Sequence, residues 1–197
     1  MRIVINKLTM KKIVLIIVFL FVLPITAQYS EATITFKNGT ELNGLIKSNS
    51  RGISFKKDEN SKKLRYKKKG IDCIKMHDID KTYCYRYIKK SKIVKIELLI
   101  TGKVTLYKHI VYKKFGGNGW NGGNEGNYTE THYFGSRGNE KILTKILNLD
   151  GPFARGFKKA TSKYFKDCPK LVSLIKEGNY NRDEIEEVVN YYNKNCE

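Results

Sequence analysis

The side chains best suited to catalysis or metal binding are histidines, and two of them fall in one predicted hairpin. Residues 104–115 and 128–134 are rich in β-branched and aromatic residues, which predicts the two arms of a long β-hairpin. If this hairpin closes symmetrically on its tip, His109 lies opposite Phe134, and His132 is the diagonal neighbour of His109 on the same face. Such a pair could bind a metal ion with a nearby carboxylate, as in a metal-dependent hydrolase. Cross-strand polar pairs are also common on solvated faces, so the sequence favours no metal site.

The third histidine, His77, lies in a predicted turn beside Asp78 and Asp80. Histidine and aspartate occur together in nuclease-like sites, but no third group is evident, and turns favour aspartate for their own geometry. The chain has no G-x-S-x-G nucleophile motif and no H-E-x-x-H zinc motif. Its glycine-rich stretch neither follows the P-loop pattern nor opens a helix. The sequence therefore predicts no catalytic residue and no cofactor.

Basic residues dominate the charge of the chain, which has a formal net charge of +19. Their densest run is a basic strip that consists of Lys62, Lys63, Arg65, Lys67, Lys68 and Lys69. These side chains could hold a phosphate or carboxylate polymer as point charges. They could equally protect an edge strand from sheet-to-sheet aggregation.

Two aromatic features could contact a ligand. Tyr83, Tyr85 and Tyr87 alternate along a predicted strand and so share one face. That face could stack on nucleic-acid bases, but a half-buried sheet face explains the pattern as well. Trp120 is the one aromatic residue in the glycine-rich hairpin tip, 116–127. It could anchor a partner, or the tip could be an ordinary flexible connection.

Residues 1–27 predict a signal peptide. Four basic residues flank the start of an apolar run, 13–23, which is shorter than the ~20 residues of a membrane-spanning helix. Ala27 supplies a small residue before the predicted cleavage, and Gln28 would be the new N-terminus. The alternative is an uncleaved membrane anchor. Cleavage would lower the net charge to +15 and leave an exported protein, periplasmic or extracellular, with no transmembrane span.

Export makes disulfide bonds the expected state of the four cysteines. Cys73 and Cys84 lie symmetrically about the predicted turn at 77–80, and Cys168 and Cys196 bracket a predicted pair of helices. Four cysteines allow three pairings, but this local geometry favours Cys73–Cys84 and Cys168–Cys196. A zinc site is the rival interpretation, although no two cysteines have the short spacing of structural zinc sites.

The region after the signal peptide contains short strands separated by turn residues. We predict strands at 33–37, 41–47, 53–57, 62–66 and 71–76, which form a small antiparallel barrel or curled sheet over about 31–77. Asn38-Gly39 predicts a tight hairpin turn, and Gly44 a bulge or a close backbone approach. The predicted core consists of Ile34, Phe36, Leu42, Leu45, Ile53, Phe55, Leu64, Tyr66 and Ile74.

The antiparallel β region, residues 28–150, continues through long hairpins over about 81–149. Its last segment, 142–149, could be a strand or a short helix. A helical region follows over residues 151–197, with one helix at 154–165 and a second from Pro169 to Gly178. Asn181 and Glu184 predict a capping box before a third helix. The fold class is therefore α+β, with a C-terminal helical cap on the sheet.

Three segments resemble a group of uncharacterised secreted proteins of Bacteroidota-type bacteria. They are the cleavage site at Ala27-Gln28, the hairpin at 36–46, and a tail that runs from 164–172 through 191–196. The resemblance implies export and this architecture. The group has no activity that could be carried over.

These observations favour an exported, non-enzymatic protein that binds an anionic envelope polymer or another envelope protein. The basic strip would carry the charge, and Trp120 would add a loop contact. The alternatives are an extracellular nucleic-acid-binding protein, in which Tyr85 and Tyr87 stack on bases, and a metal-dependent hydrolase that uses His109 and His132.

Overall fold

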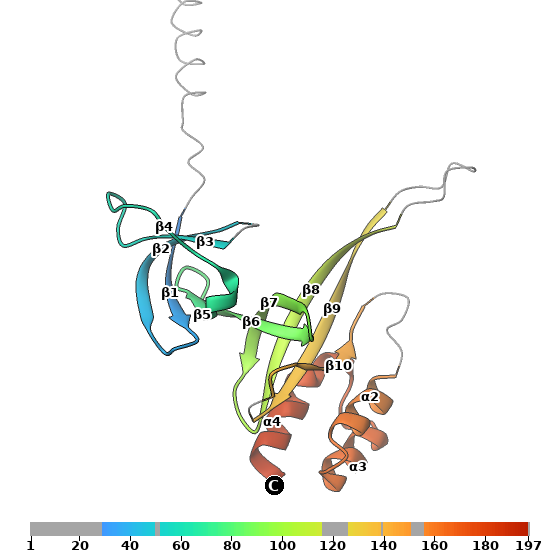
Figure 1. Ribbon diagram of the computed structural model, residues 1–197. Helices are drawn as coiled ribbons and strands as arrows, with labels where there is room; N and C mark the ends of the chain where they lie inside the picture. The colour runs from blue at the N-terminus through green and yellow to red at the C-terminus, as the bar shows by residue number, and fades with distance from the viewer. Residues whose placement is uncertain (1–28, 50–51, 116–125, 139, 151–155, 197) are drawn as a thin grey trace, which may run out of the picture.

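The structure, a computed structural model, describes residues 29–49, 52–115, 126–138, 140–150 and 156–196 (Figure 1). The predicted signal peptide and Trp120 lie outside these residues. The strands are β1 (Ser30–Phe36), β2 (Glu41–Asn49), β3 (Gly52–Lys56), β4 (Leu64–Tyr66), β5 (Ile71–Met76), β6 (Lys81–Lys89), β7 (Lys92–Ile100), β8 (Val104–Phe115), β9 (Gly126–Arg137) and β10 (Thr144–Asn148). The helices are η1 (Lys68–Gly70), α2 (Phe157–Tyr164), α3 (Pro169–Glu177), η2 (Arg182–Glu184) and α4 (Ile185–Asn195). No helix of the described residues is long and apolar enough to cross a membrane.

All these strands form one antiparallel sheet in the order β10-β9-β8-β7-β6-β5-β1-β2-β3-β4. The α+β class is confirmed. The segment at 142–149, for which the sequence left both a strand and a short helix open, contains strand β10. The sheet is curled over β1–β5 but does not close into the predicted barrel (Figure 1). Closure would require β4 to pair with β5. Both edges of β5 are already occupied, because one pairs with β1 and the other with β6.

The first hairpin turns at Asn38-Gly39, as predicted, but through a longer loop than expected. The Phe36 N–H donates to the Thr40 carbonyl at 2.8 Å, so three residues lie inside the turn. Gly39 has φ +85°, whereas Asn38 keeps a negative φ. Only Gly39 of the two central residues has a positive φ, so the loop is not the two-residue primed turn that Asn38-Gly39 predicts.

The first hydrophobic core lies inside the curl of β1–β6. Two predicted members are wrong. Leu64 is 46% exposed because β4 is a three-residue edge strand. Ile46 is buried in place of Leu45, since adjacent residues of a strand face opposite sides. The buried residues of this core are Ala32, Ile34, Ile46, Ile53, Phe55, Ile71, Ile74 and Tyr85.

A central core lies on the opposite face of the sheet. Tyr85 belongs to the first core, but its neighbour Cys84 packs with Ile96, Tyr107, Phe134 and Leu143 in the central one. The connection from β9 to β10 crosses this face and returns to β6, where the Leu143 N–H donates to the Tyr87 carbonyl at 2.8 Å. The first core and the central core therefore lie on opposite faces of the sheet.

The helices cover the face of β7–β10 that lies opposite the central core (Figure 1). Leu171 and Ile175 of α3 and Val188 of α4 are fully buried there. α3 begins with Pro169 and ends at Gly178, whose φ is +94°. The capping box of Asn181 and Glu184 is confirmed and precedes η2 and α4. The helical cap thus lies on the sheet as predicted.

Arg137 of β9 joins the helices to the sheet. Its guanidinium contacts both carboxylate oxygens of Asp167, at 2.6 and 3.0 Å, and donates to the Tyr164 carbonyl at 2.9 Å. It also donates to the Tyr192 hydroxyl at 2.6 Å. Asp167, which lies two residues before α3, is thus part of this network. The hydrogen bond from Arg137 lowers the pKa of Asp167 to about 2, against 3.8 for an ordinary aspartate.

We predict that this network makes the protein sensitive to acid. The ionised form of Asp167 is favoured in the folded state, so its stabilisation is fully present above about pH 4 and disappears as the pH falls to about 2. Because 40% of the Asp167 side chain is exposed to solvent, we expect the ionised carboxylate to add only about 1 kcal/mol to the free energy of unfolding. Urea unfolding should give Asp167→Asn a lower free energy of unfolding than the parent at pH 7 and an equal one at pH 2. An equal difference at both pH values would contradict the assignment.

Candidate functional site

The basic strip lies at one end of the sheet. Arg65 is on β4, Lys68 and Lys69 are on η1, and the other members lie in the adjoining loops. Every member except Lys68 is exposed. Within the part of the chain that the structure describes, no ion pair joins Lys62, Lys63, Arg65, Lys67 or Lys69 to an acidic side chain. No described carboxylate forms an ion pair that a ligand of these five cations would have to displace.

The positive charge extends from the strip towards β7. Lys95 lies with its ammonium 4.2 Å from the ring centroid of Tyr83. Burial lowers the pKa of Lys95, and the neighbouring charge of Lys68 lowers it further. A bound anion would relieve this repulsion.

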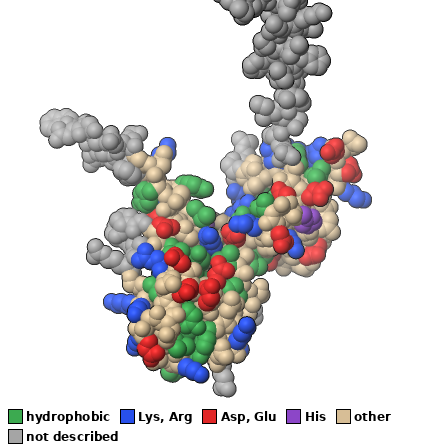
Figure 2. Space-filling model, turned by 180° about the vertical axis from the view of Figure 1, so that it is seen from behind, with side chains coloured by type: hydrophobic (Ala, Val, Ile, Leu, Met, Phe, Trp, Pro, Cys, Tyr) green, Lys and Arg blue, Asp and Glu red, His purple; other side chains and the backbone are tan. Residues whose placement is uncertain are grey.

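The remaining charge of the molecule is more evenly mixed. On the face shown in Figure 2, basic side chains are scattered among acidic ones. Several cations are also committed to carboxylates, among them Lys81 with Glu97 at 2.8 Å and Arg86 with Asp72 at 2.6 Å. Five cations of the strip, all except Lys68, differ from them in having no acidic ion-pair partner among the described residues.

Edge protection remains a second role for the same lysines. β4 pairs with β3 and is the last strand of the sheet order. Short edge strands flanked by lysines resist pairing with other chains. The position of the strip is compatible with both roles.

The two hairpin histidines lie directly opposite each other, which corrects the predicted register. His109 pairs with His132, and Phe134 pairs with Tyr107. The return arm begins at Gly126, two residues earlier than predicted, and this shifts every pair by two. Because side chains alternate with period two, the shift leaves both histidines on the expected face.

Glu130 is the acidic neighbour of this pair. Its side chain is 3% exposed and contacts Lys113 Nζ at 2.9 Å and His132 Nε2 at 2.8 Å. The hydrogen bond from Lys113, followed by that from His132, lowers the pKa of Glu130. Burial is the main cause that lowers the pKa values of His109 and His132. Near neutral pH, the cluster therefore holds two neutral imidazoles and one carboxylate that is already neutralised by Lys113.

The described residues of this cluster do not form a three-ligand metal group. Among the described residues, no group of three or more His, Cys, Asp or Glu side chains is arranged to hold a metal ion. The third histidine is placed elsewhere, where His77 Nε2 lies 2.9 Å from the Thr33 hydroxyl. The structure does not bring the three histidines together.

Of the two interpretations of the tyrosine face, the half-buried sheet face fits its central member, Tyr85, and the stacking surface does not. Tyr85 is 2% exposed and belongs to the first core. Tyr87 is partly covered, since Lys37 Nζ lies 5.6 Å from its ring centroid. A base could not stack on Tyr85 without opening the core.

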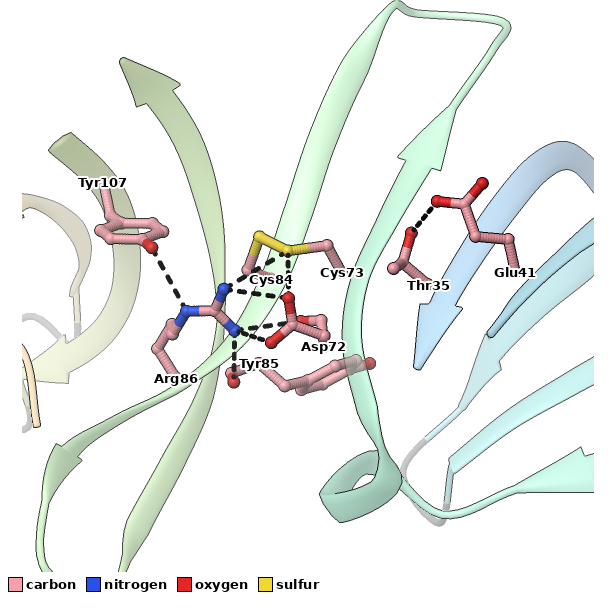
Figure 3. The surroundings of a disulfide bond; sticks show 8 residues. All are labelled: Thr35, Glu41, Asp72, Cys73, Cys84, Tyr85, Arg86 and Tyr107. Carbon is pink, nitrogen blue, oxygen red and sulfur yellow. Dashed lines mark hydrogen bonds and ion pairs between the residues drawn. A yellow bond between two sulfur atoms is a disulfide. The ribbon is translucent and has the colours of Figure 1, made fainter. Parts of the chain in front are cut away.

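Both predicted disulfides are present. Cys73–Cys84 joins directly paired residues of β5 and β6, and Cys168–Cys196 joins the start of α3 to the end of α4. Beside the first bridge, Arg86 contacts Asp72 and donates to the Tyr107 hydroxyl at 3.2 Å (Figure 3). Sequence reasoning missed this cluster, because its members are 14 and 21 positions apart and follow no motif.

No protein-family model, curated protein or solved structure matches this chain. The resemblance to secreted proteins of Bacteroidota-type bacteria therefore stays an expectation.

Proposed function

We propose that this is an exported, non-enzymatic protein that binds an anionic component of the cell envelope through the basic strip. The strip's exposed cations, which have no acidic partner among the described residues, are the observation that carries the proposal. Lysine ammonium groups bind phosphate and carboxylate polymers as point charges. The ligand class is therefore a polymer with closely spaced phosphates or carboxylates.

Two disulfides support the exported state, because such bonds persist in oxidising compartments. The nucleic-acid alternative loses support with the burial of Tyr85. The hydrolase alternative loses support because Glu130 is already engaged by Lys113 and His132. Trp120 lies outside the described residues and adds nothing to the case.

The test measures binding of the oxidised protein to lipopolysaccharide, peptidoglycan, heparin and single-stranded DNA. Each polymer is measured at low salt and at about 0.15 M, where the Debye length is about 8 Å. We expect one envelope polymer to remain bound at the higher salt concentration. Loss of all four together would show that the charge is only compositional.

Two variants, each with four lysines replaced, remove the same amount of positive charge from different parts of the surface. Replacing Lys62, Lys63, Lys67 and Lys69 with glutamine should weaken binding about 30- to 1,000-fold, if each exposed contact contributes about 0.5–1 kcal/mol. The control replaces four exposed lysines of the helical region with glutamine, namely Lys159, Lys163, Lys166 and Lys170. Equal weakening by both variants would mean that net charge, and not the strip, determines binding.

A further inference from the structure

The β8–β9 hairpin projects beyond the rest of the sheet, and its outer part has an open edge (Figure 1). β8 pairs with β9 as far as Phe115, but its pairing with β7 ends at Lys108. Beyond Lys108, no described strand lies against the other edge of β8. The remaining residues of β7 pair with β6. Seven residues of β8, from His109 to Phe115, therefore have a partner strand on one side only.

The hydrogen bonds of the hairpin show which backbone groups of β8 lie on that edge. The Thr131 carbonyl accepts from the Leu149 N–H at 2.8 Å, so it points away from β8. In an antiparallel ladder, the N–H and C=O of one residue point to the same side. Thr131 pairs with Ile110, so this pair exchanges no hydrogen bonds across the hairpin. The N–H and C=O groups of Ile110, and by alternation those of Tyr112 and Lys114, point out along the open edge.

The side chains of these residues are also exposed. Tyr112 is 82% exposed and Ile110 is 44% exposed, although both are large apolar residues on an ordered strand. They lie on one face with Lys114, because residues two apart in a strand share a face. The edge of β4 is different, since β4 is only three residues long. The longer open edge of β8 presents a row of unpaired backbone groups that can pair with another strand.

We propose that the outer edge of β8 binds an extended acidic segment of another polypeptide by strand addition. The backbone groups of Ile110, Tyr112 and Lys114 would complete a ladder with the added strand, and the Tyr112 ring would cover its apolar side chains. The charge on β8 selects the partner. Lys108 and Lys114 lie on this strand, and the nearby carboxylate of Glu130 is already paired with Lys113. An acidic strand is attracted there, and a basic one is repelled.

Amide hydrogen exchange of the isotope-labelled, oxidised protein tests this directly. The probe is a ten-residue peptide in which valine alternates with glutamate, and its counterpart carries lysine in place of glutamate. We expect the acidic peptide to slow exchange of the Ile110, Tyr112 and Lys114 amides at least tenfold. Exchange at His109 and Val111 should change little, because their N–H groups already pair with β9. The lysine peptide should have no effect.

Two variants separate strand addition from non-specific contact. Tyr112→Ala should weaken binding of the acidic peptide about tenfold, and Tyr112→Pro should abolish it by removing an outward N–H without touching the β8–β9 ladder. Ile79→Ala is the control, because Ile79 is 52% exposed in a distant turn, and it should bind like the parent.

Three results would overturn the proposal. The first is no protection at millimolar peptide, and the second is equal protection by the lysine peptide. The third is slow exchange of the three amides in the free protein. If that slow exchange disappeared on dilution, a second copy of the chain would be the occupant of the edge.

Discussion

Replacing Phe165 with alanine is expected to lower the free energy of unfolding by about 3–5 kcal/mol. Phe165 follows α2 and is fully buried in the core between the helices and the sheet. Its ring centroid lies 4.9 Å from that of Tyr164 and 5.1 Å from that of Tyr192. The truncation would remove apolar contacts on all sides and leave a cavity that the helices could close only in part. Urea unfolding, followed by circular dichroism, measures the change.

Phe36→Ala is the matched control, because it deletes the same side chain from a half-buried position of the first core. We expect a loss well below that of Phe165→Ala, since less apolar surface leaves water at this position on folding. Equal losses for the two variants would mean that the helical core is less tightly packed than the structure indicates.

Replacing Cys168 and Cys196 together with serine is expected to destabilise the protein by about 3–4 kcal/mol. The bridge closes a chain segment with a sequence separation of 28, which contains α3, η2 and α4. Without it, the unfolded chain regains the freedom of that loop. Both sulfur atoms lie in the buried helical core, so lost packing adds to the effect. The measurement is urea unfolding of the parent and the double variant under oxidising conditions.

The other bridge provides the comparison. Cys73 and Cys84 are separated by 11 positions, so the same chain-entropy model gives about 3 kcal/mol for their replacement by serine. We expect Cys168–Cys196 to contribute more to the free energy of unfolding than Cys73–Cys84. Loss of Cys168–Cys196 should increase amide hydrogen exchange first in α3 and α4. A larger loss on removing Cys73–Cys84 would show that native-state contacts, such as those around Arg86, outweigh loop length.

Local signals predicted most of the elements. Proline at the start of α3, glycine at its end and the capping box before α4 each depend on a few adjacent residues, and all three were predicted correctly. The disulfides followed from symmetry about a turn and from their position around the helices. The register of the long hairpin was wrong by two residues, because a glycine-rich tip contains no signal for where pairing resumes.

Long-range features could not be predicted from local signals. Whether five short strands close into a barrel depends on what occupies the second edge of β5, and that partner, β6, is not specified by the strands themselves. Ion pairs such as Arg137 with Asp167 join residues 30 positions apart. The sequence identified the basic strip as a charge cluster, but the absence of acidic partners for five of its members among the described residues was visible only in three dimensions.

The strand order has a consequence for how the protein folds. Almost every pair of neighbouring strands is also consecutive in the chain, and β1 with β5 is the exception. Two runs of hairpins, β1–β4 and β5–β10, can therefore form from local contacts, which form fast because they close short loops. The β1–β5 ladder, by contrast, brings Ile34 beside Ile74 and closes a loop of some forty residues. We expect this ladder to be the late step that unites the two runs into one cooperative unit.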